Sequence, residues 1–460
     1  MAANVLLAAV ALAPLYKPPC APVAPHLLAV RSAPLLSAVQ PLAVPSPLDP
    51  VAPVAAFVAL HGALRFALPR VGVRFPAPVI GMLGGFAILC LLPRETADGL
   101  EQFFDPACRL MRDWLAAIFA PGFIALPLAM PVVTASDMAT FLALCAVGLV
   151  ATIASNAAIA GLLAPRHAVE FEQQDLGVSD AGPPPTPPNP FPAAQQFWLV
   201  GVALGGAAVH LVLRDAFSLC ASLLATTLGS FSLAMTLTAP AVKMWLHPFL
   251  TCSLATLGAC GAIGAASGAG GMAVLESYMA AGGAGRLLSH LMGPTVLSFA
   301  FQLYRYRAQL RRRAVQICGT ALLGSFTAML TSAAAVRAAG LNPALRLAFL
   351  GRNTISALAI EICLIFGVQP PALGLLAAFA TGLLAFPFGK TVLELLRVRD
   401  PAARGLALAG AAHGGGLLAI SDEPEAFPFA ALGMNLFGAC AVTLVSVPPV
   451  ARLLRAVAGM

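Results

Sequence analysis

The sequence predicts an all-α polytopic membrane protein with about twelve transmembrane helices, some of them broken or re-entrant. Of its 460 residues, 59% are hydrophobic and only 10% are charged, and long apolar runs recur from about residue 51 to the C-terminus. Runs of about 20 apolar residues are long enough to cross a bilayer as helices. They lack the period-2 alternation of barrel strands, so helices are the remaining way to satisfy the backbone in lipid.

The charge and the cysteines exclude several classes of site. The formal net charge of +7 comes from 26 Lys and Arg against 19 Asp and Glu, and much of the excess lies in short loops between apolar runs. Basic loops set the orientation of membrane proteins, so no nucleic-acid partner is predicted. The ten cysteines are scattered singly, so we expect neither a metal site nor a disulfide framework. No catalytic or nucleotide-binding motif occurs, so neither an enzyme nor a cofactor is predicted.

The N-terminus differs in composition from the rest of the chain. Residues 1–48 contain no Asp or Glu and are rich in Ala, Ser and Pro. This composition is typical of an organellar transit peptide, which we predict over residues 1–48. A membrane anchor over residues 5–15 is the competing interpretation, but that run is too short to span a bilayer and prolines interrupt it.

The next part of the chain predicts a four-helix membrane domain over residues 51–163. Its apolar runs lie at about 51–69, 76–93, 114–132 and 138–163. The charged segment 93–113 is taken as a joint between two of these runs. Residues 164–196 then combine acidic side chains with the run PPPTPPNPFP, which predicts an extended, solvated linker and a domain boundary.

Residues 197–460 form the second predicted domain. Its apolar runs lie at about 197–214, 219–238, 249–274, 285–304, 315–336, 346–366, 371–390, 403–420 and 427–447. Five arginines between residues 305 and 313 make the densest basic cluster of the chain, so this loop is expected on the cytosol-equivalent side. A second basic loop lies at 390–404. The same rule places it on the cytosol-equivalent side, which requires that the segment starting at Gly351 does not cross the membrane. We therefore expect a broken or re-entrant helix there, as in the binding sites of transporters.

Polar residues at this predicted break make a candidate anion site. Arg352 precedes Asn353, Thr354 and Ser356, and a helix starting near Asn353 would bring free N–H groups, hydroxyls and a guanidinium together. The alternative is that Arg352 extends to the membrane interface and Asn353 only caps a helix. Glu361 lies nine residues after Arg352, on the opposite face of a continuous helix, so it either carries a coupling proton or packs against a neighbouring helix.

His413 stands before three glycines, and this is the sharpest local feature of the sequence. Gly414, Gly415 and Gly416 disfavour a helix, so the backbone there is expected to be unwound or closely approached by another element. A histidine at such a break can donate a hydrogen bond to a carboxylate and titrate near neutral pH. The alternative is a close helix crossing with His413 satisfied internally.

Two further segments carry structural predictions. Asp422 is expected to cap the next helix, with Glu425 at its third position. Gly293 and Pro294 suggest a second interrupted helix, which would form the opposite wall of the same site.

Several motifs resemble the LrgB/CidB family. They are RVRDPAARGLALAGAAHGGG at 397–416, LMGPTVLSFAFQLYR at 291–305 and the window at 350–361. The N-terminal half is similar to the smaller LrgA/CidA partner through RFPAPVIGML at 74–83 and FAPGFIALPL at 119–128. The chain therefore resembles a fusion of an LrgA-like domain (51–163) with an LrgB-like transport domain (197–460).

Other stretches resemble the plastid branch of this family, the glycolate/glycerate translocators. They are LSFAF at 297–301, DEPEAFPF at 422–429 and SVPP at 446–449. The family pattern has Pro-Lys where this chain has Gly351-Arg352, and Thr-Ala where it has Leu417-Leu418. These departures keep a helix breaker and a cation but leave the choice of substrate open.

The resemblance implies a secondary transporter that exports glycolate and imports glycerate across the chloroplast inner envelope during photorespiration. Arg352 would then bind the carboxylate, Asn353, Thr354, Ser356 or His413 the hydroxyl, and Glu361 or His413 a coupling proton. The alternative is a holin-like or regulatory protein that controls envelope permeability. Proton symport or exchange, and a monomer or a homodimer, are left open.

Overall fold

The computed structural model describes residues 50–73, 75–129, 133–165, 191–239, 242–243 and 246–460. Every regular element in this part of the chain is helical, which confirms the all-α prediction. Eight of the described helices are long and apolar enough to cross a membrane, or up to nine with one bent pair, so the count of about twelve stays a prediction. The predicted transit peptide and most of the predicted linker lie outside the described residues.

The helices before the linker are α2 to α7. Their bounds are α2 Val51–Arg70, α3 Ala77–Leu91, α4 Arg94–Asp113, α5 Leu115–Ile124, α6 Leu126–Ala129 and α7 Ala135–Leu162. The predicted joint at 93–113 is wrong, because α4 is a helix. It buries Ala97, Ala107, Leu110 and Met111 on one face and leaves its charges on the other, so its hydropathy is low although its periodicity is helical.

The helices after residue 190 run from α8 to α21, and α8 begins inside the predicted linker of residues 164–196. Their bounds are α8 Ala193–Leu213, α9 Ala216–Leu237, α11 Pro248–Ser267, α12 Gly271–Met279, α13 Ala284–Arg305, α14 Arg307–Arg312, α15 Ala314–Ala338, α16 Pro343–Ala348, η4 Phe349–Gly351, α17 Ser356–Phe366, α18 Leu373–Leu395, α19 Pro401–Ala419, α20 Phe427–Ser446 and α21 Pro448–Ala458. The single run expected at 249–274 is two helices, because Gly268 ends α11 in the left-handed conformation (φ +73°).

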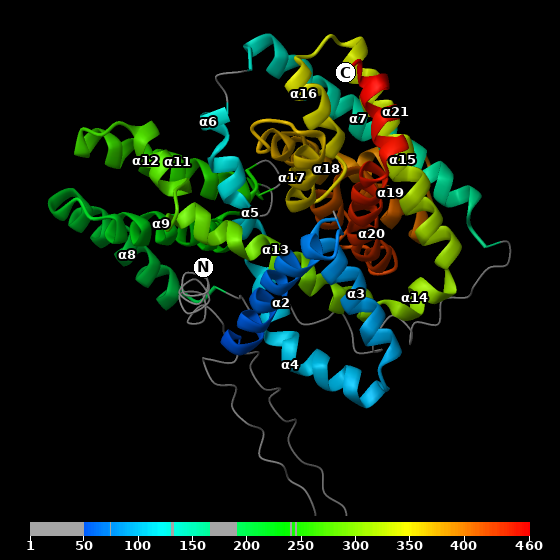
Figure 1. Ribbon diagram of the computed structural model, residues 1–460, viewed down its shortest axis with the longest axis horizontal. Helices are drawn as coiled ribbons and strands as arrows, with labels where there is room; N and C mark the ends of the chain where they lie inside the picture. The colour runs from blue at the N-terminus through cyan, green and yellow to red at the C-terminus, as the bar shows by residue number, and fades with distance from the viewer. Residues whose placement is uncertain (1–49, 74, 130–132, 166–190, 240–241, 244–245) are drawn as a thin grey trace, which may run out of the picture.

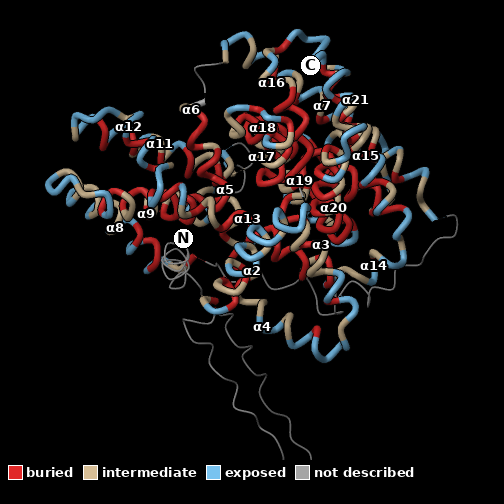
Figure 2. The backbone as a smooth tube through the Cα atoms, in the orientation of Figure 1, coloured by how far each residue is buried: buried red, intermediate tan, exposed pale blue. Residues whose placement is uncertain are grey.

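Figure 1 shows an arm and a body. Helices α8, α9, α11 and α12 project to one side, while α15 to α21 gather on the other, where α7 packs against α15, α18 and α19. Helices α19 and α20 are mostly buried, whereas α8 exposes most of its length (Figure 2). In a bilayer, exposed apolar faces contact lipid. Buried polar groups inside the body are costly there, so they are the candidates for a functional site.

Helix α13 is continuous, so the prediction of a break at Gly293-Pro294 is wrong. The glycine serves close packing, because a Cβ at Gly293 would lie 2.2 Å from Cε1 of His61 in α2. Helix α13 packs mainly against α2, α3 and α5 and therefore does not form a wall of the site at Arg352. Pro294 removes one backbone hydrogen bond without ending the helix.

Helix α7 connects the two halves of the chain. It precedes the linker, yet it packs against α15, α18 and α19 of the C-terminal half. Thr134 caps its N-terminus by accepting a hydrogen bond from the Asp137 backbone N–H, in a capping box. The helix thus enters the body of the protein beside the two segments that the sequence predicts to be broken.

Candidate functional site

The first break lies between α16 and α17. After α16 the chain makes the single 3₁₀ turn η4, then a non-helical turn, and α17 begins at Ser356 rather than near Asn353. Ile355 precedes the new helix in an extended conformation (φ −63°, ψ 147°). The interruption predicted at Gly351 is thus confirmed, while its re-entrant course stays a prediction.

The second break lies within α19. Ala412 (φ −149°, ψ 17°) and His413 (φ 37°, ψ −108°) leave the helical conformation, and the positive φ of His413 is unfavourable for an L-residue. A Cβ at Gly415 would lie 2.1 Å from the Gly382 carbonyl oxygen of α18, so only glycine permits this approach. Both features predicted around the glycine run are present: the backbone is unwound at Ala412 and His413, just before the glycines, and Gly415 admits a neighbouring helix.

The two breaks meet at Arg352 and His413. The imidazole Nε2 of His413 lies 3.4 Å from the Arg352 carbonyl oxygen, and the residues are 7% and 2% exposed. Broken helices leave backbone N–H and C=O groups without helical partners at membrane depth, which is how transporters build binding sites. Two segments 61 residues apart are thereby brought together.

The guanidinium of Arg352 is held by hydroxyls. Its Nε donates to Ser332 Oγ of α15 (2.9 Å) and its Nη2 donates to Thr152 Oγ1 of α7 (2.7 Å). Gly148 of α7 makes room, because a Cβ there would lie 2.8 Å from Arg352 Cζ. Nη1 has no hydrogen-bond partner, and no Asp or Glu of the described chain forms an ion pair with Arg352.

The predicted residues beside Arg352 divide into two kinds. Thr354 uses its hydroxyl locally, donating to the Gly351 carbonyl oxygen (2.8 Å), so it stabilises the turn. Asn353 is 5% exposed, and neither end of its carboxamide has a partner in the described residues. Ser356 is buried at the first position of α17. Asn353 therefore has donor and acceptor groups that no described residue uses.

In the described part of the chain, Glu361 of α17 forms no hydrogen bond or ion pair with Arg352 or His413, and the charge that acts on it is Arg65 of α2. The expected placement on opposite faces of one continuous helix does not apply to Glu361 and Arg352, because Arg352 lies in the break before α17.

A buried arginine without a carboxylate is unstable by itself. Removing a cation from water costs several kcal/mol unless an anion or a full set of hydrogen bonds compensates. Thr152 and Ser332 supply two neutral acceptors, which is incomplete. The arrangement can therefore bind a small anion, and a carboxylate matches the planar guanidinium best. Among the described residues no group of three His, Cys, Asp or Glu could hold a metal.

Thr152, Ser332 and Gly148 are site residues that the sequence analysis missed. They lie on α7 and α15, which were interpreted as plain membrane spans. A signal existed, since Gly148 and Thr152 are four residues apart and share one helix face. Nothing in the sequence said which helix that face would meet.

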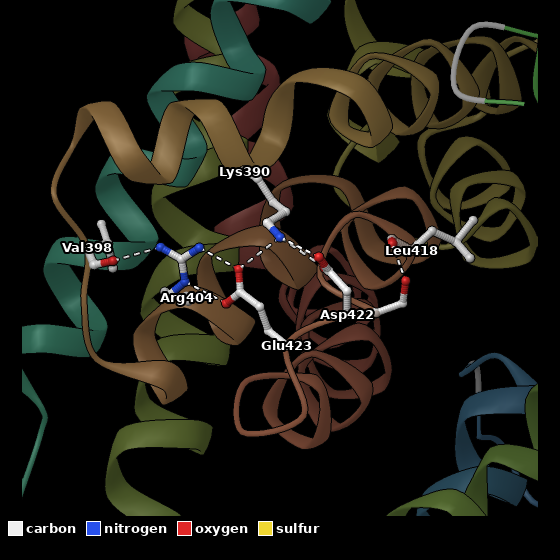
Figure 3. Close-up of polar contacts among 7 residues, drawn as sticks. Lys390, Val398, Arg404, Leu418, Asp422 and Glu423 are labelled. Atoms are coloured by element: carbon white, nitrogen blue, oxygen red, sulfur yellow. Dashed lines mark hydrogen bonds and ion pairs between the residues drawn. The ribbon is translucent and has the colours of Figure 1, made fainter. Parts of the chain in front are cut away.

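The predicted cap at Asp422 is wrong. Helix α20 begins at Phe427, with Ala426 before it and no side-chain cap. Asp422 and Glu423 instead bind Lys390 and Arg404 (Figure 3). Two nearby cations attract these carboxylates more strongly than a helix terminus would.

Comparison with known proteins agrees with the motifs. Residues 227–452 match the LrgB-like family. Plastidal glycolate/glycerate translocator 1 of Arabidopsis thaliana is 30% identical over 411 residues, covering 86% of this chain and 78% of that protein. Antiholin-like protein LrgB of Bacillus cereus is 28% identical over 166 residues, 36% of this chain and 70% of the relative. No solved structure matches the chain.

The family match includes both broken helices but not α7, which supplies Thr152. The relatives are named as a translocator and as antiholin-like proteins rather than as enzymes, in agreement with the sequence. The chain therefore belongs to the LrgB-like family and is similar, along most of its length, to a plastidal glycolate/glycerate translocator.

Proposed function

We propose that the protein is a secondary carrier for small 2-hydroxycarboxylates in the chloroplast inner envelope, exporting glycolate and importing glycerate. The name of the plant relative supports this substrate pair and this organelle. The predicted transit peptide at residues 1–48 is consistent with the same destination.

One observation carries the proposal: Arg352 is a buried cation between two broken helices, and no acidic residue of the described chain pairs with it. The substrate carboxylate would supply the missing negative charge. Asn353, with both ends of its amide unpaired, would bind the 2-hydroxyl. Movement about the breaks at Gly351 and His413 would then alternate access to the site.

The second candidate is a holin-like or regulatory protein, which the bacterial antiholin-like relatives favour. A permeability pathway needs no buried, uncompensated arginine. It would also pass solutes without saturation, whereas a carrier saturates and shows counterflow.

Uptake of labelled glycerate by proteoliposomes distinguishes the two. Liposomes containing the protein are loaded with glycolate or left empty and tested with and without a proton gradient. We expect saturable uptake that internal glycolate accelerates. Unsaturable uptake, indifferent to the solute, would contradict the carrier.

The proton gradient in the same assay tests coupling. Acceleration by the gradient alone indicates symport, and His413 would be the proposed proton carrier because it lies at the site. Glu361 is the other proposed carrier, and its place near Arg65 predicts a smaller effect of Glu361→Gln on uptake.

A further inference from the structure

A buried polar seam leads away from Arg352 between α7 and α15. On α7 it comprises Gly148, Thr152, Asn156 and Ala160, and on α15 it comprises Gln316, Thr320, Gly324 and Ser332. Residues four apart are neighbours on a helix surface, so each set follows one ridge of its helix, with Ser332 two steps beyond Gly324. Contacts at several levels show that the two stripes face each other.

The two ends of the seam are fixed by hydrogen bonds. At one end Arg352 joins Thr152 to Ser332. At the other end Gln316 Nε2 donates to the Ala160 carbonyl oxygen (3.0 Å) and to Asp400 Oδ2 (3.1 Å). From Gly148 to Ala160 the helix rises about 18 Å, which is more than half of a bilayer core of about 30 Å.

The far end of the seam lies beside the basic loop. Arg313, the last arginine of the cluster at residues 305–313, pairs with Asp400 (3.4 Å), so the acid there is neutralised. Clustered positive charge attracts small anions from solution. The seam therefore joins the buried Arg352 to the face of the protein where a carboxylate would concentrate.

Asn156 lies in the middle of the seam and is fully buried. Neither its Oδ1 nor its Nδ2 has a hydrogen-bond partner in the described residues. Its carboxamide fits between two glycines: a Cβ at Gly324 of α15 would lie 2.3 Å from Oδ1, and a Cβ at Gly410 of α19 would lie 2.4 Å from Nδ2. Two helices thus make room for a polar group that they do not bind.

Thr320 repeats this property one turn away on α15. It is fully buried, and its Oγ1 has no partner in the described part of the chain. Buried amides and hydroxyls in a purely structural seam are normally bonded, because an unsatisfied group loses its hydration without compensation. Unpaired groups at successive levels of one seam, which ends at a guanidinium whose Nη1 has no partner in the described residues, indicate a pathway for a polar solute.

We propose that Asn156 is a second binding station for the transported 2-hydroxycarboxylate, on a polar route between Arg352 and the face that carries the arginine cluster. Its Nδ2 would donate to the carboxylate and its Oδ1 would accept from the hydroxyl. Thr320 is the next hydrogen-bonding group on the way out. This inference rests on the carrier function proposed above.

The test compares Asn156→Val with Asn156→Thr, two substitutions of nearly equal shape that differ in one hydroxyl. Glycolate-driven uptake of labelled glycerate is measured in proteoliposomes at equal pH on both sides, together with the thermal stability of the purified protein. We expect Asn156→Val to lower uptake at subsaturating glycerate at least 10-fold without lowering stability, because apolar replacement of an unpaired polar group is tolerated. Asn156→Thr should stay within about 3-fold of the unmutated protein, since it keeps a polar group.

Gln195→Leu is the matched control. Gln195 in α8 is also a buried amide with both ends unpaired in the described residues, but it lies away from the seam, so uptake should not change. Thr320→Val provides a second test if Asn156→Val does not fold, with an expected decrease of about 3-fold or more.

The outcomes separate the two proposals. If the unmutated protein shows no saturable uptake, the carrier function itself is wrong. If the unmutated protein transports and Arg352→Gln abolishes uptake, while Asn156→Val and Thr320→Val transport normally, the carrier stands and the polar route is wrong.

Discussion

Arg352 and Arg404 lie in the same half of the chain, but only the charge of Arg404 is compensated by a carboxylate of the described residues. Arg404 binds Glu423 through two parallel hydrogen bonds, Nε to Oε2 (2.7 Å) and Nη2 to Oε1 (2.6 Å), and its Nη1 donates to the Val398 carbonyl oxygen (2.9 Å). Arg352 is more deeply buried, yet its partners in the described part of the chain are two neutral hydroxyls, and its Nη1 has no partner there.

Under the proposed carrier function, this difference separates a structural ion pair from a binding site. At Arg404 the protein supplies its own anion, and Lys390 joins the same cluster through Asp422, so the contacts are complete without a ligand (Figure 3). At Arg352 the fold accepts the cost of burying a cation and leaves its counter-charge to come from elsewhere. Incomplete compensation is thus the better indicator of a binding site than burial alone.

The largest expected effect tests this comparison directly. Arg352→Gln removes a charge-assisted contact worth about 3 kcal/mol, so glycerate uptake per folded protein should fall about 100-fold. Arg404→Gln is the matched control and should lower stability but leave uptake within about 3-fold once folded protein is counted. Equal losses of uptake in both variants would contradict the distinction.

Two of the glycines after His413 test how closely the backbones of α19 and α18 approach each other. Gly415→Ala places a Cβ against the Gly382 carbonyl oxygen, so the protein should lose about 1 to 3 kcal/mol of stability. A Cβ at Gly414 meets nothing within 4 Å, so Gly414→Ala should change stability by about 0.5 kcal/mol or less. Thermal unfolding in detergent measures both, and similar melting temperatures would refute the close approach.

Glu423→Gln tests the self-compensated cluster. It removes the anion from Arg404, whose side chain is 14% exposed, and should cost about 1 kcal/mol of stability with normal uptake in the protein that folds. Glu425→Gln is the control, because Glu425 is exposed and forms no ion pair in the described chain. A loss of transport in Glu423→Gln at unchanged stability would assign this cluster a direct role.

The smallest effect is on the pH dependence of stability. Hydrogen bonds from Lys390 lower the pKa of the Asp422 carboxyl, and hydrogen bonds from Arg404 lower the pKa of the Glu423 carboxyl. Because both groups titrate lower in the folded protein, their contribution is complete above their ordinary pKa values of 3.8 and 4.5 and is lost as the pH falls below them.

Melting curves between pH 7 and 3 measure this contribution. We expect it to be below about 1 kcal/mol, since the side chain of Asp422 is 70% exposed. The double variant Asp422→Asn/Glu423→Gln should show a weaker acid dependence than the unmutated protein. An unchanged acid transition would show that other carboxylates dominate it.

Much of the architecture could be predicted from the sequence, because lipid imposes a simple rule on composition. Apolar runs predict helices, and Gly351 and the glycines after His413 predict the two breaks, since glycine weakens a helix relative to other non-proline residues. Helix α4 escaped because hydropathy averages over its two faces, and a test for helical periodicity would have found it.

The hydrogen-bond partners of Arg352 could not be predicted from local sequence patterns. Thr152 and Ser332 are 200 and 20 residues away from Arg352, and nothing local to either indicates the other. Asn156 and Gly410 likewise meet only because α7 and α19 cross. Such contacts depend on which helix faces meet, and local propensity does not encode that choice.

The hydrogen bond from Arg352 to Thr152 has a consequence for how the site is assembled. The two residues lie on opposite sides of residues 166–190, so each site requires one copy of each half of the chain. A covalent connection fixes that stoichiometry at one to one and holds the halves at a high effective concentration. Separately produced halves would have to find each other in the membrane before Arg352 acquired its full set of partners, so the assembly of the site would depend on their abundance.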